Sequence, residues 1–244
     1  MPSFKKIAHR GASGRYPENS RLAFEKAIAA GADMIEIDCQ LSADGQVVVF
    51  HDERLARTTG ARGKVHDKTL AQLRALDIGK WRKPVFRGEK ILTLEEALEI
   101  FSGNVDLCLE IKCPPGAPPG LELKLLFILS HYDYLDRTVI SSFDYRSLAR
   151  VRELAPEAGL AVLHGMRSDN EDPLTVAERL GATSIHVQKQ LAQTEFCHRA
   201  WANGLDVCVW TVNDRREIDR FVDLGVQGIF SDYPERLAGI GWRR

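Results

Sequence analysis

Short apolar runs alternate along the chain with stretches of helical periodicity. Nine runs are typical of strands: residues 6–10, 34–40, 47–52, 107–112, 138–143, 160–165, 184–188, 207–213 and 228–232. Apolar residues three or four apart predict helices at residues 20–31, 93–101, 123–132, 145–154, 175–181, 195–204 and 216–225. Several of these stretches end in glycine, which best accepts the left-handed conformation after a helix.

This alternation predicts parallel strands joined by right-handed crossovers. A length of 244 residues suits a single closed α/β barrel. Nine runs exceed the eight places of such a barrel, and residues 41–46 are too short for a crossover helix. We therefore expect that link to return as extended chain and one run to lie outside the regular barrel.

Residues 53–92 interrupt the alternation and are richer in arginine, lysine and glycine. We expect one short helix there, started by a capping box between Thr69 and Gln72, and a second capping box from Thr93 to Glu96 where the pattern resumes. The segment is interpreted as an insertion within a single domain of residues 1–244.

Charge and composition exclude some functions. The formal net charge is −1 with no basic or acidic tail, so a nucleic-acid partner is not favoured, whereas a small anionic substrate remains open. No apolar run approaches the ~20 residues that span a bilayer, and no signal-like segment opens the chain. The five cysteines are odd in number without C-x-x-C spacing, which is typical of buried residues in a reducing compartment. We expect a cytoplasmic protein without a membrane anchor, and leave its oligomeric state open.

Carboxylates interrupt two of the apolar strands. Glu36 and Asp38 are two apart, so both point to one face with Cα atoms roughly 7 Å apart, and Glu110 and Lys112 repeat that spacing. Three carboxylates in a barrel interior need neutralising, and a divalent cation with oxygen ligands would do so. The alternative is an internal ion-pair network that includes Lys112 and Arg10.

Two histidines end predicted strands at the face where barrel enzymes carry their sites. His9 ends the first strand and His51 ends the third. A lone histidine there is commonly a satisfied polar residue, but two beside a carboxylate cluster are typical of an acid–base pair. Arg10 can present a bidentate fork to a phosphate group.

An ordered set of motifs covers nearly the whole chain: HRG, PENS, EID, FHD followed by RTTG, LEIK, SSF, WTVN and GVQGIFSDYP. This set resembles the glycerophosphodiester phosphodiesterase family, and is similar to its short cytosolic bacterial members. The resemblance implies a TIM-type (β/α)8 barrel with a small insertion after the HD strand, here residues 53–92. Ser20 replaces the usual Thr of the second motif.

The resemblance also implies an activity. Members hydrolyse glycerophosphodiesters, such as glycerophosphocholine and glycerophosphoethanolamine, to sn-glycerol 3-phosphate and an alcohol. They use one divalent cation, Mg²⁺ or Ca²⁺, and a histidine pair. The corresponding metal ligands here are Glu36, Asp38 and Glu110; the catalytic histidines are His9 and His51; the phosphate-contacting cations are Arg10 and Lys112.

Other motif residues keep two interpretations each. Glu18 is a substrate-binding residue or a solvated loop acid, and Asn19 is a site residue or a helix N-cap. Trp210 forms an apolar wall for the glycerol or packs in the core. His186 and Gln188 could line the site; Asn213 and Asp232 could simply organise loops, and Trp81 and Phe86 of the insertion could close over a headgroup or pin the insertion to the barrel.

Three further functions stay open. A lysophospholipase D would need an exposed apolar groove, which no run in the insertion suggests. A catalytically silent binding module is disfavoured because His9, His51 and the carboxylates are intact. An enolase-like or aldolase-like barrel would need a lysine at a strand end, for which Lys112 is the only candidate.

Overall fold

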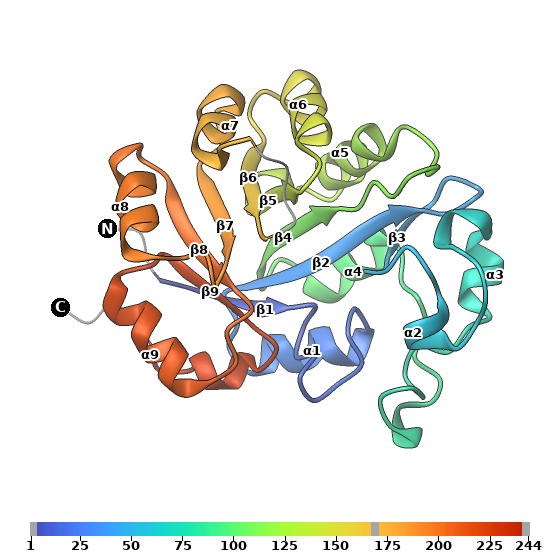
Figure 1. The fold of residues 1–244 in the computed structure, drawn as a ribbon. Helices are drawn as coiled ribbons and strands as arrows, with labels where there is room; N and C mark the ends of the chain where they lie inside the picture. The colour runs from blue at the N-terminus through green and yellow to red at the C-terminus, as the bar shows by residue number, and fades with distance from the viewer. Residues whose placement is uncertain (1–3, 167–170, 241–244) are drawn as a thin grey trace.

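Eight parallel strands form a closed barrel in this computed structural model, which describes residues 4–166 and 171–240 (Figure 1). In order around the barrel they are β1 (Lys5–His9), β2 (Met34–Leu41), β4 (Asp106–Ile111), β5 (Thr138–Ser142), β6 (Gly159–His164), β7 (Ser184–Gln188), β8 (Asp206–Trp210) and β9 (Gly228–Ser231). Strand β1 pairs with both β9 and β2 and so closes the sheet. The predicted barrel is confirmed.

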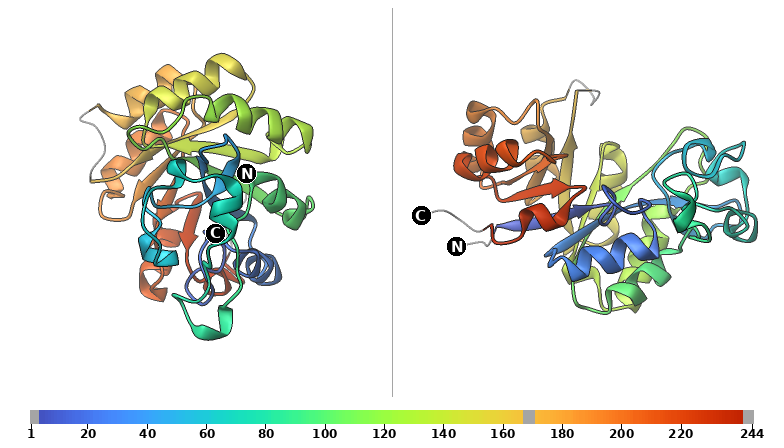
Figure 2. Two further views of the ribbon diagram at one scale, coloured as in Figure 1. Left: turned by 90° about the vertical axis from the view of Figure 1, so that its right-hand side faces the viewer. Right: turned by 90° about the horizontal axis from the view of Figure 1, so that it is seen from below.

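Helices cover the outside of the barrel (Figures 1 and 2). They are α1 (Arg21–Ala29), α4 (Leu94–Phe101), α5 (Leu121–His131), α6 (Tyr145–Leu154), α7 (Pro173–Leu180), α8 (Thr194–Ala202) and α9 (Arg215–Leu224). All seven were predicted, and α6 has the predicted bounds. Their apolar residues join those of the strands in the main core. Where α1 meets α4, Phe24 and Phe101, both 0% exposed, lie edge to face with ring centroids 5.2 Å apart.

The third apolar run, residues 47–52, forms β3 (Val47–Val49), which lies outside the barrel. It runs antiparallel to β2, with Cys39 opposite Val49. The intervening residues 42–46 are too few to return the chain to the start of a parallel strand, so the chain reverses as a hairpin. Gly45 accepts the reversal at φ +75°. The expectation of one run outside the regular barrel is confirmed.

Residues 53–92 fold over the far side of β3, away from α8 (Figures 1 and 2). Helix α3 (Leu70–Arg74) begins at the predicted Thr69–Gln72 capping box. The expectation of a single helix is wrong, because α2 (Ala56–Thr59) and two 3-10 turns, Val65–Asp67 and Pro84–Phe86, are also present. One helical turn is too short to show a period. The segment has a small core of its own with β3: Val48, Phe50, Leu55, Val65, Leu73, Ile78 and Ile91.

The barrel interior is apolar over part of its length and charged over another part. An apolar cluster fills part of it: Ile7, Met34, Cys108, Cys208 and Phe230. The middle of β2, level with the last residue of β1, and the end of β4 instead carry the buried acids Glu36, Asp38 and Glu110. Charged groups are therefore concentrated at the face where the strands end.

All five cysteines are free, as the sequence predicts. Burial holds for four of them, whereas Cys113 is exposed because it follows β4 in a loop. In the two described stretches, no helix has the length and apolar character required to cross a bilayer. That residues 1–244 form one domain with 53–92 as an insertion stays a prediction.

Candidate active site

A cavity opens where the barrel strands end, and it is lined by His9, Arg10, Glu36, His51, Glu110, Lys112, Ser141, Phe143, Leu163, His186, Trp210 and Phe230. The sequence predicts nine site residues: three metal ligands, two catalytic histidines, two phosphate-contacting cations, Glu18 and Trp210. Seven of these nine line the cavity. The other two lie directly behind them: Asp38 is completely buried beneath Arg10 and Lys112, and Glu18 lines an adjoining groove. The fold therefore brings all nine to one place.

Three carboxylates form the acidic centre of this place. Glu36 and Asp38 project from the same face of β2, and Glu110 stands opposite Asp38 on β4. One oxygen from each lies within 4.8 Å of the others. Burial and the Asp38 charge raise the pKa of Glu36 well above its usual value, and burial raises that of Glu110.

Two cations partly neutralise the acids. Burial alone would raise the pKa of Asp38, but Lys112 and Arg10 hold it far below its usual range. Lys112 Nζ lies 3.1 Å from Asp38 Oδ1, and Arg10 Nε lies 3.3 Å from Asp38 Oδ2. Lys112 also contacts Glu110. The predicted ion-pair network thus exists alongside the acidic cluster.

The cluster suits a divalent cation. When all three carboxyl groups are ionised, they exceed the two cations by one negative charge, and oxygen ligands are those that Mg²⁺ and Ca²⁺ prefer. Asp38 Oδ1 is buried and has no hydrogen-bond partner, although it forms an ion pair with Lys112 Nζ. A bound cation would satisfy that oxygen and lower the repulsion that Glu36 experiences.

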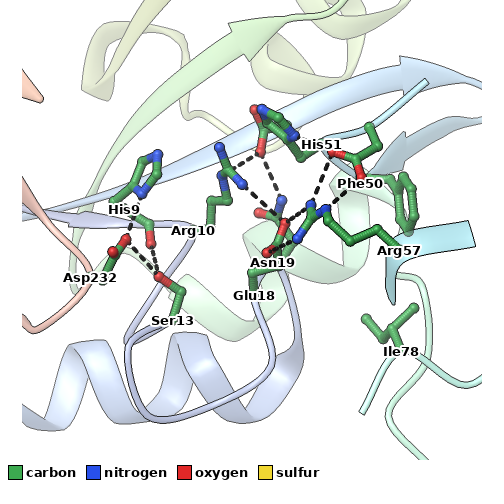
Figure 3. Close-up of polar contacts among 12 residues, drawn as sticks. His9, Arg10, Ser13, Glu18, Asn19, Phe50, His51, Arg57, Ile78 and Asp232 are labelled. Atoms are coloured by element: carbon green, nitrogen blue, oxygen red, sulfur yellow. Dashed lines mark hydrogen bonds and ion pairs between the residues drawn. The ribbon is translucent and has the colours of Figure 1, made fainter. Parts of the chain in front are cut away.

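Each histidine is oriented by a carboxylate, and Figure 3 shows the contact between His9 and Asp232. His9 Nδ1 lies 2.7 Å from Asp232 Oδ1, and His51 Nδ1 lies 2.6 Å from Asp52 Oδ1. Because Nδ1 is engaged in both rings, Nε2 remains for a bound molecule. Burial lowers the pKa of His51. Burial would raise the pKa of Asp232, but hydrogen bonds from His9, Asn213 and Ser13 lower it to about 2.

Sequence reasoning did not identify these two aspartates as partners of the histidines. The sequence pattern indicates a loop-organising role for Asp232 and assigns no role to Asp52. A usable signal is present, since each aspartate is the last residue of a strand-like run. Asp232 is further held by Asn213 Nδ2 at 2.6 Å.

Residues 10, 18 and 19 form a second layer of contacts (Figure 3). Arg10 has a left-handed backbone, φ +55°, and its guanidinium donates to Glu18 Oε1 at 3.1 Å. Glu18 is largely buried, so it is not a solvated loop acid. The N-cap interpretation of Asn19 is wrong: Ser20 caps α1, while Asn19 Nδ2 donates to Asp38 Oδ2 at 2.9 Å. Asn19 at φ +55° lacks the extended backbone of a typical N-cap.

Aromatic side chains form the opposite wall of the cavity. Trp210 of β8 meets Phe143 edge to face, with ring centroids 5.8 Å apart, and its Nε1 donates to the carbonyl of His186 at 2.9 Å. Burial lowers the pKa of His186 to about 3, so this ring stays neutral. Gln188 instead accepts from the backbone of Met166. The cavity therefore has one charged wall and one largely apolar wall.

Comparison with known proteins agrees with this geometry. Residues 9–236 match the model of the glycerophosphoryl diester phosphodiesterase family. A glycerophosphodiester phosphodiesterase of Caldanaerobacter subterraneus is 37% identical over 96% of both chains, and one of Bacillus subtilis is 35% identical over 94% of this chain and 83% of its own.

Solved structures agree as well. A phosphodiesterase of Oleispira antarctica, solved in complex with the product sn-glycerol-3-phosphate, is 31% identical and superposes with a TM-score of 0.88 over 95% of this chain and 94% of its own. The protein is thus an enzyme that belongs to the glycerophosphoryl diester phosphodiesterase family.

Proposed function

We propose that this enzyme hydrolyses glycerophosphodiesters, such as glycerophosphocholine and glycerophosphoethanolamine, to sn-glycerol 3-phosphate and an alcohol. The observation that carries the proposal is a pair of carboxylate-oriented histidines in one cavity with three buried acids and two cations. The Oleispira antarctica enzyme, whose structure holds that product, supports it. Five free cysteines support a reducing compartment, and hence the cytoplasm, as its location.

His9 and His51 are proposed as the acid–base pair. One Nε2 accepts the proton of the attacking hydroxyl while its oxygen bonds to phosphorus; the other Nε2 donates a proton to the alcohol oxygen as its bond to phosphorus breaks. Asp232 and Asp52 accept from Nδ1 and so stabilise the protonated ring in each case. Which histidine plays which part is left open, as is the choice between water and the substrate's own 2-hydroxyl as nucleophile.

The remaining predicted residues bind the substrate and the cation. Glu36, Asp38 and Glu110 would hold one Mg²⁺ or Ca²⁺, which when bound would stabilise negative charge on the phosphoryl oxygens. Arg10 and Lys112 line the same cavity and would contact the phosphate. Trp210 would pack against the glycerol, and Glu18 would keep the Arg10 guanidinium in place.

The test is release of sn-glycerol 3-phosphate from each of the two diesters after EDTA treatment, with Mg²⁺, Ca²⁺ or Mn²⁺ restored in turn. We expect release only when a cation is restored. His9→Ala and His51→Ala should each abolish all but a small residual turnover while the melting temperature stays near that of the parent. Release that persists in EDTA, or near-normal turnover in either variant, would contradict the proposed mechanism.

A further inference from the structure

An arginine of the insertion reaches the active site. Arg57 belongs to α2, yet its guanidinium contacts two carboxylates of the barrel face (Figure 3). Nε and Nη2 donate to the two oxygens of Asp52 at 2.6 and 3.0 Å. Nη1 and Nη2 donate to the two oxygens of Glu18, each at 2.7 Å. One side chain thus binds both carboxylates in bidentate fashion.

Each of these carboxylates also binds a residue of the proposed machinery. Asp52 accepts from His51 Nδ1 at 2.6 Å, and Glu18 accepts from Arg10 Nη1 at 3.1 Å. Arg57 therefore stands one carboxylate away from the acid–base His51 and one carboxylate away from the phosphate-binding Arg10. Without it, Asp52 and Glu18 would each lose two hydrogen bonds and could rotate away from their partners.

The support for Arg57 comes from the insertion. Leu55 and Thr58, which flank Arg57 in the chain, are 0% and 3% exposed. Leu55 lies in the small core shared with β3. Trp81 of the same segment lies beneath the guanidinium, 5.7 Å from ring centroid to Cζ. The position of Arg57 is therefore set by how the insertion packs on the barrel.

We propose that Arg57 is a positioning residue, which holds Asp52 and Glu18 so that His51 and Arg10 keep their working orientations and turnover depends on a docked insertion. The inference rests on the proposed function for the roles of His51 and Arg10. Only arginine suits the position, because its planar fork can bind two carboxylates at once, whereas a lysine ammonium is a single point of contact.

The first experiment compares Arg57→Met and Arg57→Lys with a matched control, Arg74→Met. Arg74 also lies in the insertion, and its side chain is similarly exposed, 44% against 42% for Arg57. It pairs with Glu96 of α4 instead of a site residue. We expect both Arg57 variants to lose roughly 10- to 100-fold in kcat, a part of the 10²–10⁴ that an acid–base group contributes. Arg74→Met should stay within twofold.

A double variant separates positioning from general damage. In a His51→Ala background, Arg57→Met should lower the residual kcat by less than it does in the parent, because the contribution through Asp52 and His51 is already lost and only that through Glu18 and Arg10 remains. A full second loss there, or Arg57→Met activity within threefold of the parent, would overturn the inference. Melting temperatures show whether Arg57→Met folds. If it does not fold, Arg57→Lys replaces it in both backgrounds.

A second measurement needs no turnover. The protein labelled with ¹⁵N-histidine should show hydrogen-bonded Nδ1 protons for His9 and His51, assigned by loss in His9→Ala and His51→Ala. Arg57→Met should shift or remove the His51 signal and spare that of His9, and Arg74→Met should spare both. An unchanged His51 signal would refute the inference even if the parent enzyme hydrolyses glycerophosphodiesters. If the parent does not, the proposed function fails and this signal still decides the role of Arg57.

Discussion

Replacing Asp232 by asparagine should disable His9 while leaving the shape of the site intact. The reason lies in Asn213, whose amide orientation is fixed: its Oδ1 accepts from the backbone of Asp232 at 2.9 Å and from Ser231 Oγ at 3.1 Å. Its Nδ2 must therefore face residue 232, where it donates to Oδ2 at 2.6 Å. An asparagine at 232 has to turn its oxygen toward Asn213 and its NH₂ group toward His9.

This reversal changes the state of the His9 ring. An NH₂ group facing Nδ1 obliges that nitrogen to accept, so the ring proton moves to Nε2, which can then no longer take a proton from a nucleophile. The protonated ring is also disfavoured, because its Nδ1–H would meet the NH₂ group. In the parent, the pKa of Asp232 of about 2 keeps the carboxylate charged at every working pH. We expect kcat to fall by about 10²–10⁴, the full contribution of an acid–base group.

The assay is steady-state release of sn-glycerol 3-phosphate at saturating cation, with Asp214→Asn as the control. Asp214 caps α9, where its Oδ1 accepts from the backbone of Arg216 at 2.9 Å, and asparagine caps a helix as well as aspartate does. The control should keep kcat and melting temperature. A kcat for Asp232→Asn within threefold of the parent would show that the Nδ1 contact does not set the working state of His9.

Two further predictions concern the cation and the core. Glu110→Gln removes one of the three buried charges and should raise the cation concentration needed for half-maximal activity, measured by titration after EDTA treatment; an unchanged titration would make Glu110 only an ion-pair partner of Lys112. Phe101→Ala removes a ring that is 0% exposed against Phe24 and should lower the free energy of unfolding by about 3–5 kcal/mol in urea titration, with kcat of the folded fraction unchanged. A decrease in the free energy of unfolding below 1 kcal/mol would mean that the core around residue 101 collapses to fill the cavity.

Local patterns in the sequence were sufficient for much of this fold. Helix periods and the capping boxes at Thr69 and Thr93 depend on residues three or four positions apart, and the structure confirms them. The two-residue spacing of Glu36 and Asp38 likewise places their side chains on one face of β2 without any tertiary contact. The predicted N-cap at Asn19 is wrong because of a long-range contact: Asn19 donates to Asp38 of β2, and Ser20 caps α1 instead.

The sequence alone determined a strand–helix barrel and the kinds of side chain at its mouth, because both follow from patterns a few residues long. Only the tertiary structure decided which of these side chains work together. His9 finds Asp232 across 223 positions of the chain once β9 closes against β1, and Arg57 meets Glu18 across 39 positions once the insertion packs on β3. Such pairs carry no local pattern, since closing the barrel and packing the insertion create the proximity that makes them partners.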